Sequence, residues 1–201
     1  MGRERDGGAP GGSPEATAAT LHAENARLNA ELARAERRIA ELEARADVDP
    51  LLDIINRRGF ERALKRSLAY LQRYGTRAAL VFIDLDGFKA VNDRHGHAAG
   101  DALLRQAAAA LTAHVRASDV VGRLGGDEFG VLMWHIDTDK AALKARELEA
   151  AIEAAGVVLG SERISVGASA GVVPLGAGLD VAAAIDAADR AMYARKKERR
   201  G

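Results

Sequence analysis

The chain carries the stretch AALVFI at residues 78–83, followed directly by DLDGFK at residues 84–89. The first half is an unbroken apolar run of strand length, which is typical of a strand buried on both faces of a sheet. Acidic side chains at the C-terminal end of such a strand usually lie at a ligand crevice. The stretch therefore predicts a central strand that delivers Asp84 and Asp86 to a binding edge.

Helical and strand patterns alternate around this central run. The apolar spacing and the turn residues predict helices over 56–74, 98–115, 139–155 and 181–197, and strands over 120–124, 129–134 and 164–173. The strands on either side of the GGDE turn form a hairpin. This order predicts an α+β or α/β sandwich in which helices cover a central sheet.

A heptad pattern sets the N-terminal part of the chain apart. Its a and d positions, spaced alternately by four and three, are Leu21, Asn25, Leu28, Leu32, Ala35, Ile39, Leu42 and Ala46. The stripe would also suit one amphipathic helix docked on its own domain, but its narrow width and the Asn at an a position favour a parallel dimer. We expect a disordered segment at 1–16, a coiled-coil dimerisation helix at 17–47 and a domain at 48–201, with a boundary at Pro50.

Composition excludes several functional classes. The chain has 29 basic residues (Lys and Arg) and 29 acidic residues (Asp and Glu), so no net positive charge attracts nucleic acid. Aromatic residues are only 4%, which leaves few side chains on which bases could stack. The absence of Cys excludes disulfides and Cys-ligated metals. Because no apolar run approaches the ~20 residues that span a bilayer, and the first residues lack the apolar core of a signal peptide, we expect a cytoplasmic protein without membrane insertion.

The hairpin turn forms a second acidic constellation, RLGGDEF at residues 123–129. Gly125 and Gly126 permit positive φ and let the backbone approach a ligand closely. Acids at a turn are often merely solvated, and an Asp before a helix often merely caps it, but neither explanation accounts for both constellations. Hard oxygen ligands from two strands suit Mg²⁺ completed by phosphates, and the turn after Asp86 offers N–H groups for a phosphate nest.

These segments resemble a known family. The run GGDEF at 125–129 is the motif that names the GGDEF domain, the catalytic domain of diguanylate cyclases. The resemblance covers about residues 47–200 and rests also on DPL at 49–51 with NRR at 56–58, DLDGFKAVND at 84–93, GHAAGD at 96–101, RASD at 116–119, SAG at 169–171 and ADRAMYARK at 188–196. The sequence departs from the family at Leu52-Asp53-Ile54, where TGL is usual, and at Arg199-Arg200, where GR is usual.

The resemblance implies a fold, a reaction and a metal site. The fold would be α+β, with a central mostly antiparallel sheet flanked by helices, like the palm of nucleotidyl cyclases. The reaction would condense two GTP into cyclic di-GMP and two pyrophosphates at the interface of a homodimer. Asp84, Asp127 and the Leu85 carbonyl would bind Mg²⁺ or Mn²⁺. Either Asp127 or Glu128 would help to deprotonate the attacking hydroxyl, and the sequence does not choose between them.

The family also implies a substrate site around these acids. Asn92 and Asp101 would read the guanine, while Gly125 and Gly126 would let the backbone approach the nucleotide. Phosphate ligands would be the backbone N–H groups of Phe88 and Lys89 and the side chains of Lys196 and Arg200. Without the family, Asp101 would simply cap a helix over 102–115, a role compatible with reading the guanine, and the basic tail would be a solvated helix end.

Regulation and assembly follow from the same resemblance. Arg116 and Asp119 would form an inhibitory site for the product; the alternative is a helix-end arginine paired with Asp119. Because the product has two-fold symmetry, we expect the coil to hold two domains together, with a hinge at 47–50. Rival interpretations are a catalytically silent GGDEF domain that binds cyclic di-GMP or GTP, and a scaffold that uses only its coil.

Overall fold

The structure is a computed structural model that describes residues 21–22, 24–25, 27–36, 38, 46–176 and 178–200. The chain divides into two units, Met1–Arg45 and Ala46–Gly201. In the first unit the described residues are helical, and Leu21, Leu28 and Leu32 are exposed. The segment expected to be disordered at 1–16 lies outside the described residues, as does the part of the expected coil at 17–20, 23, 26, 37 and 39–45. Pairing of two coils therefore stays a prediction.

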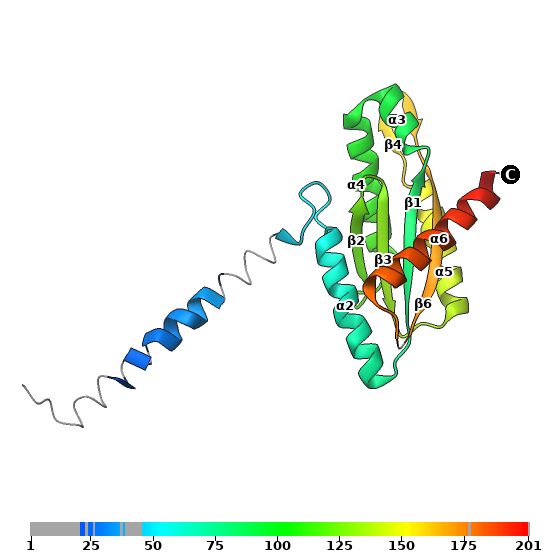
Figure 1. The fold of residues 1–201 in the computed structure, drawn as a ribbon. Coiled ribbons are helices and arrows are strands. Elements are labelled where there is room, and N and C mark those ends of the chain that lie inside the picture. Colours follow the sequence, from blue (N-terminus) through cyan, green and yellow to red (C-terminus); the bar gives the residue numbers. More distant parts are fainter. Residues whose placement is uncertain are drawn as a thin grey trace, which may run out of the picture. The chain divides into compact units, whose positions relative to one another are not determined.

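The second unit is built on a four-stranded antiparallel sheet in the order β2-β3-β1-β6 (Figure 1). The strands are β1 (Ala78–Asp86), β2 (Val120–Gly125), β3 (Glu128–Trp134) and β6 (Gly167–Leu175). A separate small hairpin joins β4 (Val157–Leu159) to β5 (Glu162–Ile164). The expected α+β fold with a mostly antiparallel sheet is confirmed, and the apolar run at 78–83 is indeed a central strand.

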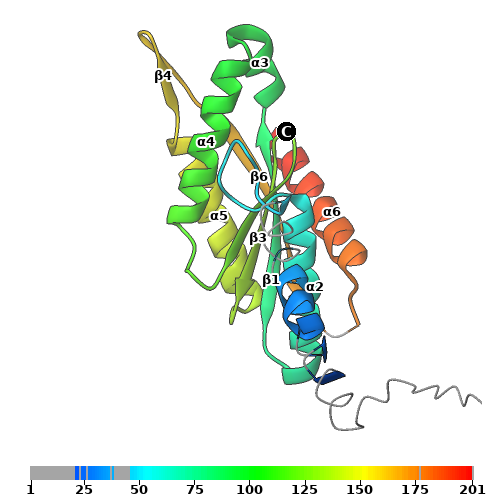
Figure 2. The same ribbon diagram turned by 90° about the vertical axis from the view of Figure 1, so that its left-hand side faces the viewer.

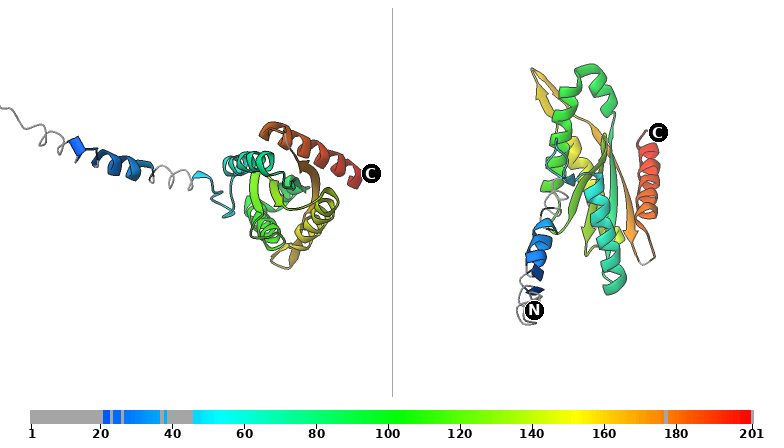
Figure 3. Two further views of the ribbon diagram at one scale, coloured as in Figure 1. Left: turned by 90° about the horizontal axis from the view of Figure 1, so that it is seen from below. Right: turned by 60° about the vertical axis from the view of Figure 1, so that its left-hand side comes forward.

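Helices cover both faces of this sheet, as the end-on view in Figure 3 shows. Alternate residues of β1 enter two different cores. Ala79, Val81 and Ile83 pack with α4 (His97–Ala113) and α5 (Thr138–Ala154), whereas Leu80 and Phe82 pack with α2 (Arg57–Tyr74) and α6 (Val181–Arg200). Burial on both faces explains why the strand sequence is apolar without alternation.

Local signals define most helix boundaries. Asn56 caps α2 by accepting a hydrogen bond from the Gly59 N–H, and Gly75 ends the helix in the left-handed region at φ 64°. The expected helix at 98–115 begins earlier, at His97 after Gly96, so Asp101 lies inside α4 and does not cap it. The alternative role of Asp101 as a helix cap is therefore wrong.

Two expectations missed local breaks in the chain. The expected strand at 164–173 is divided, because residue 164 ends β5 and β6 begins at Gly167. A short helix, α3 (Phe88–His95), follows directly after β1 where only a turn was expected (Figure 2). The left-handed Gly87, at φ 76°, turns the chain from the strand into this helix.

The segment before α2 belongs to the domain. Asn56 Nδ2 donates to the Ala46 carbonyl at 2.8 Å, and the Asn56 N–H donates to the Asp47 carbonyl. Asp47 also pairs with Arg58 at 2.9 Å. These bonds fix the stretch at 47–50 to the domain, which argues against the expected hinge there. Among the described residues no helix has the length and apolarity needed to cross a membrane.

Candidate active site

The two acidic constellations meet at one end of the sheet. In the register of the sheet, Asp84 of β1 lies opposite Glu128 of β3. The Leu85 N–H donates to the Asp127 carbonyl at 3.2 Å, which holds the β2–β3 turn against the end of β1. The structure therefore brings together Asp84, Leu85, Asp127 and Glu128, as the sequence predicted.

The carboxylates crowd one another in a partly buried place. Burial raises the pKa of Asp84. The negative charges of Asp127 and Asp86 raise this pKa further, whereas Lys196 lowers it. Burial likewise raises the pKa of Glu128, against the influence of Arg57. This concentration of negative charge is what a bound cation would neutralise.

The donor set fits Mg²⁺ or Mn²⁺. Among the described residues no three or more His, Cys, Asp or Glu side chains gather closely enough to enclose a metal ion. Mg²⁺ does not need such a cage, because it usually keeps several waters and takes one or two carboxylates plus substrate phosphates. Asp84 and Asp127, with the backbone carbonyl of Leu85, supply that number of hard oxygen ligands.

Cations from α6 reach the same end of β1. Lys196 forms an ion pair with Asp84 and lies 3.7 Å from Asp86. Arg199 lies 3.9 Å from Asp86, and Ser169 Oγ donates to Asp86 at 3.0 Å. The side chain of Arg200, the other predicted phosphate ligand, lies outside the described residues.

A half-buried arginine that the sequence motifs left without a role shapes the acidic turn. The Arg123 guanidinium donates to the Gly126 carbonyl through Nη2 at 2.7 Å and Nε at 3.1 Å. Its Nη1 pairs with Asp49 at 3.2 Å, and Asp49 also accepts from the Leu51 N–H. Arg123 thus ties the segment before α2 to the turn that carries Asp127. The only sequence signal was an arginine beside the two glycines.

The guanine-reading candidates lie on neighbouring helices. Asn92 of α3 packs its carboxamide against α4, since a Cβ on Gly100 would stand only 2.0 Å from Asn92 Oδ1. Asp101 is the next residue along α4, so the two predicted base ligands come close together. A side chain at Gly100 would therefore displace the carboxamide of Asn92.

The start of α3 offers backbone donors. No side chain caps this helix at Gly87. The N–H groups of Phe88 and Lys89 belong to its first turn, where N–H groups have no partner within the helix and the helix dipole favours an anion. The predicted phosphate ligands are therefore placed beside Asp86, at the end of β1.

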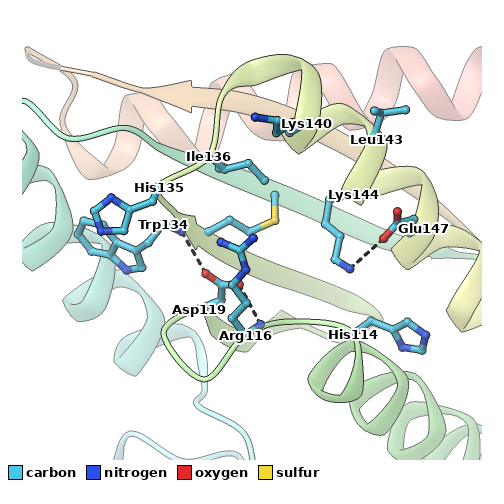
Figure 4. Close-up of a pocket in the computed structure, with 11 residues that line it drawn as sticks. His114, Arg116, Asp119, Trp134, His135, Ile136, Lys140, Leu143, Lys144 and Glu147 are labelled. Atoms are coloured by element: carbon cyan, nitrogen blue, oxygen red, sulfur yellow. Dashed lines mark hydrogen bonds and ion pairs between the residues drawn. The ribbon is translucent and has the colours of Figure 1, made fainter.

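The predicted inhibitory pair lies apart, in the loop before β2. The Asp119 carboxylate accepts from the backbone N–H groups of Arg116 and Trp134, at 3.0 and 3.1 Å. The bond between the predicted partners thus uses the backbone N–H of Arg116 rather than its guanidinium. Figure 4 shows both side chains at a cavity of about 450 Å³ that Lys140 and Lys144 also line. The arrangement offers positive charge and aromatic surface to an anionic ligand.

Comparisons with a family model and with curated proteins both match this chain to diguanylate cyclases. The family model described as "Diguanylate cyclase, GGDEF domain" matches residues 46–201. The chain is 42% identical, over 81% of its length, to the probable diguanylate cyclase DgcE of Escherichia coli, and 37% identical, over the same share, to the diguanylate cyclase TpbB of Pseudomonas aeruginosa. It covers only 15% of the first relative and 38% of the second.

A solved structure extends the similarity. The crystal structure of the coiled coil and GGDEF domain of DgcB from Caulobacter crescentus, in complex with c-di-GMP, superposes with a TM-score of 0.74 at 25% identity. The alignment covers 89% of this chain and 95% of that one. The likeness therefore extends to almost the whole of the solved chain.

Proposed function

The chain belongs to the GGDEF domain family, and on this premise we propose that it is a diguanylate cyclase that condenses two GTP into cyclic di-GMP and two pyrophosphates. The observation that carries the proposal is the convergence of Asp84, near the end of β1, and Asp127, in the turn before β3, beside the backbone N–H groups of Phe88 and Lys89 at the start of α3. Phosphoryl transfer depends on positioning and charge neutralisation, and both are provided here. The family's reaction therefore matches the chemistry of the site.

Asp84, Asp127 and the Leu85 carbonyl would hold the divalent cation. When bound, such an ion neutralises phosphate charge and makes a coordinated hydroxyl more acidic. Asp127 or Glu128 accepts the proton of the attacking 3′-hydroxyl. We favour Asp127 as metal ligand and Glu128 as the supporting base, because the raised pKa of Glu128 makes it a stronger proton acceptor.

The remaining residues bind and orient the nucleotide. Asp101 accepts hydrogen bonds from N1–H and N2–H₂ of guanine, a donor pair that adenine lacks, and Asn92 assists it. The N–H groups of Phe88 and Lys89 and the ammonium of Lys196 hold the β- and γ-phosphates, with Arg200 as a further phosphate ligand. Gly125 and Gly126 keep the turn free of side chains where the backbone meets the nucleotide.

Two copies of the domain are needed because one domain holds one GTP and the product is two-fold symmetric. We propose that the heptad helix supplies a coiled coil that raises the local concentration of the facing domain. The solved DgcB chain likewise contains a coiled coil and a GGDEF domain. Deleting residues 1–46 should depress specific activity most at low protein concentration, and equal activity at all concentrations would contradict this role.

Product inhibition completes the proposal. Arg116 and the cavity beside it would bind cyclic di-GMP, whose phosphates and guanine edges suit the guanidinium fork. Asp119 would hold the loop in shape through the two backbone N–H groups that it accepts.

The direct test is to incubate the purified chain with GTP and Mg²⁺ and to analyse the nucleotides. We expect cyclic di-GMP with two pyrophosphates for each molecule formed. Binding of GTP or cyclic di-GMP without turnover would instead identify a silent binding module, and the absence of both would leave only a scaffold.

A further inference from the structure

A buried carboxylate lies outside the proposed catalytic machinery. Glu149 of α5 is only 4% exposed. Its Oε1 accepts a hydrogen bond from the Ala170 N–H at 2.8 Å. Because β6 is an edge strand of the described sheet, the outward backbone groups of this strand have no neighbouring strand there to pair with. Glu149 therefore satisfies a donor that the sheet leaves open.

Two arginines from α6 complete the cluster. Arg195 reaches Glu149 Oε2 at 3.2 Å, and Arg199 reaches the same oxygen at 3.5 Å. Arg199 also donates to the Ala168 carbonyl at 2.9 Å, the next outward backbone group of β6. One acid and two cations thus close the free edge of the strand.

The cluster joins elements that lie on opposite faces of the sheet. Leu148 and Ile152 of α5 belong to one core, whereas Ala188 and Met192 of α6 belong to the other. Figure 2 shows the two helices on either side of the sheet. The Glu149 cluster is therefore a tie around the edge of β6, which fixes the C-terminal part of α6 to α5.

This tie holds the stretch of α6 that faces the acids. Arg195 and Arg199 are four residues apart and share one side of the helix. Lys196 lies between them in sequence and turns toward Asp84 and Asp86. The rotation and depth of this last part of α6 decide where the Lys196 ammonium stands.

We propose that Glu149 is a positioning residue that anchors Arg195 and Arg199 and thereby sets Lys196 at the triphosphate site. The inference rests on the proposed function in one respect, the role of Lys196 as a phosphate ligand. Glu149 itself does not touch the nucleotide. Its effect should appear in the binding of phosphate groups and not in the recognition of the base.

The test compares two ligands on the full chain by calorimetry: a non-hydrolysable GTP analogue with Mg²⁺, and GMP. Glu149→Gln keeps the size of the side chain and an acceptor for the Ala170 N–H but removes the charge. We expect Glu149→Gln to weaken binding of the triphosphate analogue about 10-fold, as for other residues that orient a ligand-binding group. The affinity for GMP, which lacks the β- and γ-phosphates, should stay unchanged.

Matched variants separate the possible causes. Glu153→Gln removes an exposed acid of the same helix that also pairs with Arg199, at 3.4 Å, and should leave both affinities unchanged. Arg195→Gln removes only one anchor, so it should weaken the triphosphate analogue in the same direction but less. This variant keeps the test decisive if Glu149→Gln does not fold.

Lys196→Met distinguishes the two levels of the argument. One outcome is that Lys196→Met weakens binding of the triphosphate analogue while Glu149→Gln and Arg195→Gln leave it unchanged. That result refutes the positioning role of Glu149 but keeps the role of Lys196 as a phosphate ligand. If Lys196→Met has no effect, that phosphate role fails. An equal loss of GMP and triphosphate affinity in Glu149→Gln would show a general stabilising role only and would also overturn the inference.

Discussion

Replacement of Gly171 by Ala probes the packing that holds α6 on the sheet. A Cβ on Gly171 would stand 2.0 Å from the Met192 N and 2.4 Å from the Ala188 carbonyl oxygen. Both are backbone atoms of α6, so no side chain can rotate away to relieve the contact. The helix must instead retreat by at least about 1 Å to restore ordinary separations.

The cost of that retreat follows from core packing. Overpacking a close contact destabilises by about 3 kcal/mol where the backbone must move. For a chain of this size, such a loss lowers Tm by about 6–12 °C. Displacing Lys196 by about 1 Å should also reduce kcat/KM for GTP condensation by about 10²-fold.

Thermal melting and initial-rate measurements on Gly171→Ala test this reasoning. Gly176→Ala is the control, because a Cβ there meets nothing within 4 Å and Gly176 is not among the glycines with positive φ. The control should melt within about 2 °C of the unmodified chain. If Gly171→Ala melts and turns over like its control, the close packing of α6 on β6 is wrong.

Four other substitutions test separate parts of the account. Arg123→Gln should lower kcat about 10-fold and cost about 2 kcal/mol in the free energy of unfolding, because Gly126 and Asp49 lose their cation; unchanged kinetics would refute the link. Glu128→Gln should raise Tm near pH 8, because burial disfavours the charged carboxylate that it removes. The Glu128 carboxyl binds its proton more tightly in the folded chain than in the unfolded one, so the stability of the unmodified chain falls as the pH rises above 4.5. The gain in Tm from Glu128→Gln should therefore vanish at acidic pH. A difference in Tm between the two proteins that is the same at every pH would contradict this explanation. Arg116→Ala should abolish non-competitive inhibition by cyclic di-GMP with turnover intact, and surviving inhibition would exclude this site. Asp101→Ser should relax the preference for GTP over ATP, which competition kinetics would show; an unaltered preference would remove its role.

Local patterns were sufficient for most of the fold. The apolar run at 78–83 predicted a doubly buried strand, and Asn56 and Gly75 predicted both ends of α2, because burial and capping leave direct marks in a sequence. The helix at 88–95 was missed, because it is only eight residues long and begins directly after the glycine turn that ends β1. The break between β5 and β6 was missed because an apolar alternation over Ile164, Val166 and Ala168 runs across it.

The sequence predicted the residues of the candidate active site only where they belong to a motif of the GGDEF family. Asp84, near the end of β1, and Asp127, in the turn between β2 and β3, were expected to share a cation because of the resemblance to the GGDEF family. Glu149 and Arg123 could not be found in this way, since their partners are 46 residues away at Arg195 and 74 away at Asp49. Long-range ion pairs depend on how the layers pack, which neither periodicity nor spacing records.

The central claim is that Asp84 and Asp127 share a divalent cation that carries the GTP triphosphate. Electron paramagnetic resonance of Mn²⁺, titrated with a non-hydrolysable GTP analogue, tests it without turnover. We expect tight, nucleotide-dependent Mn²⁺ binding that is lost in Asp84→Asn and in Asp127→Asn. Equal Mn²⁺ binding by the unmodified chain and both variants would contradict the claim.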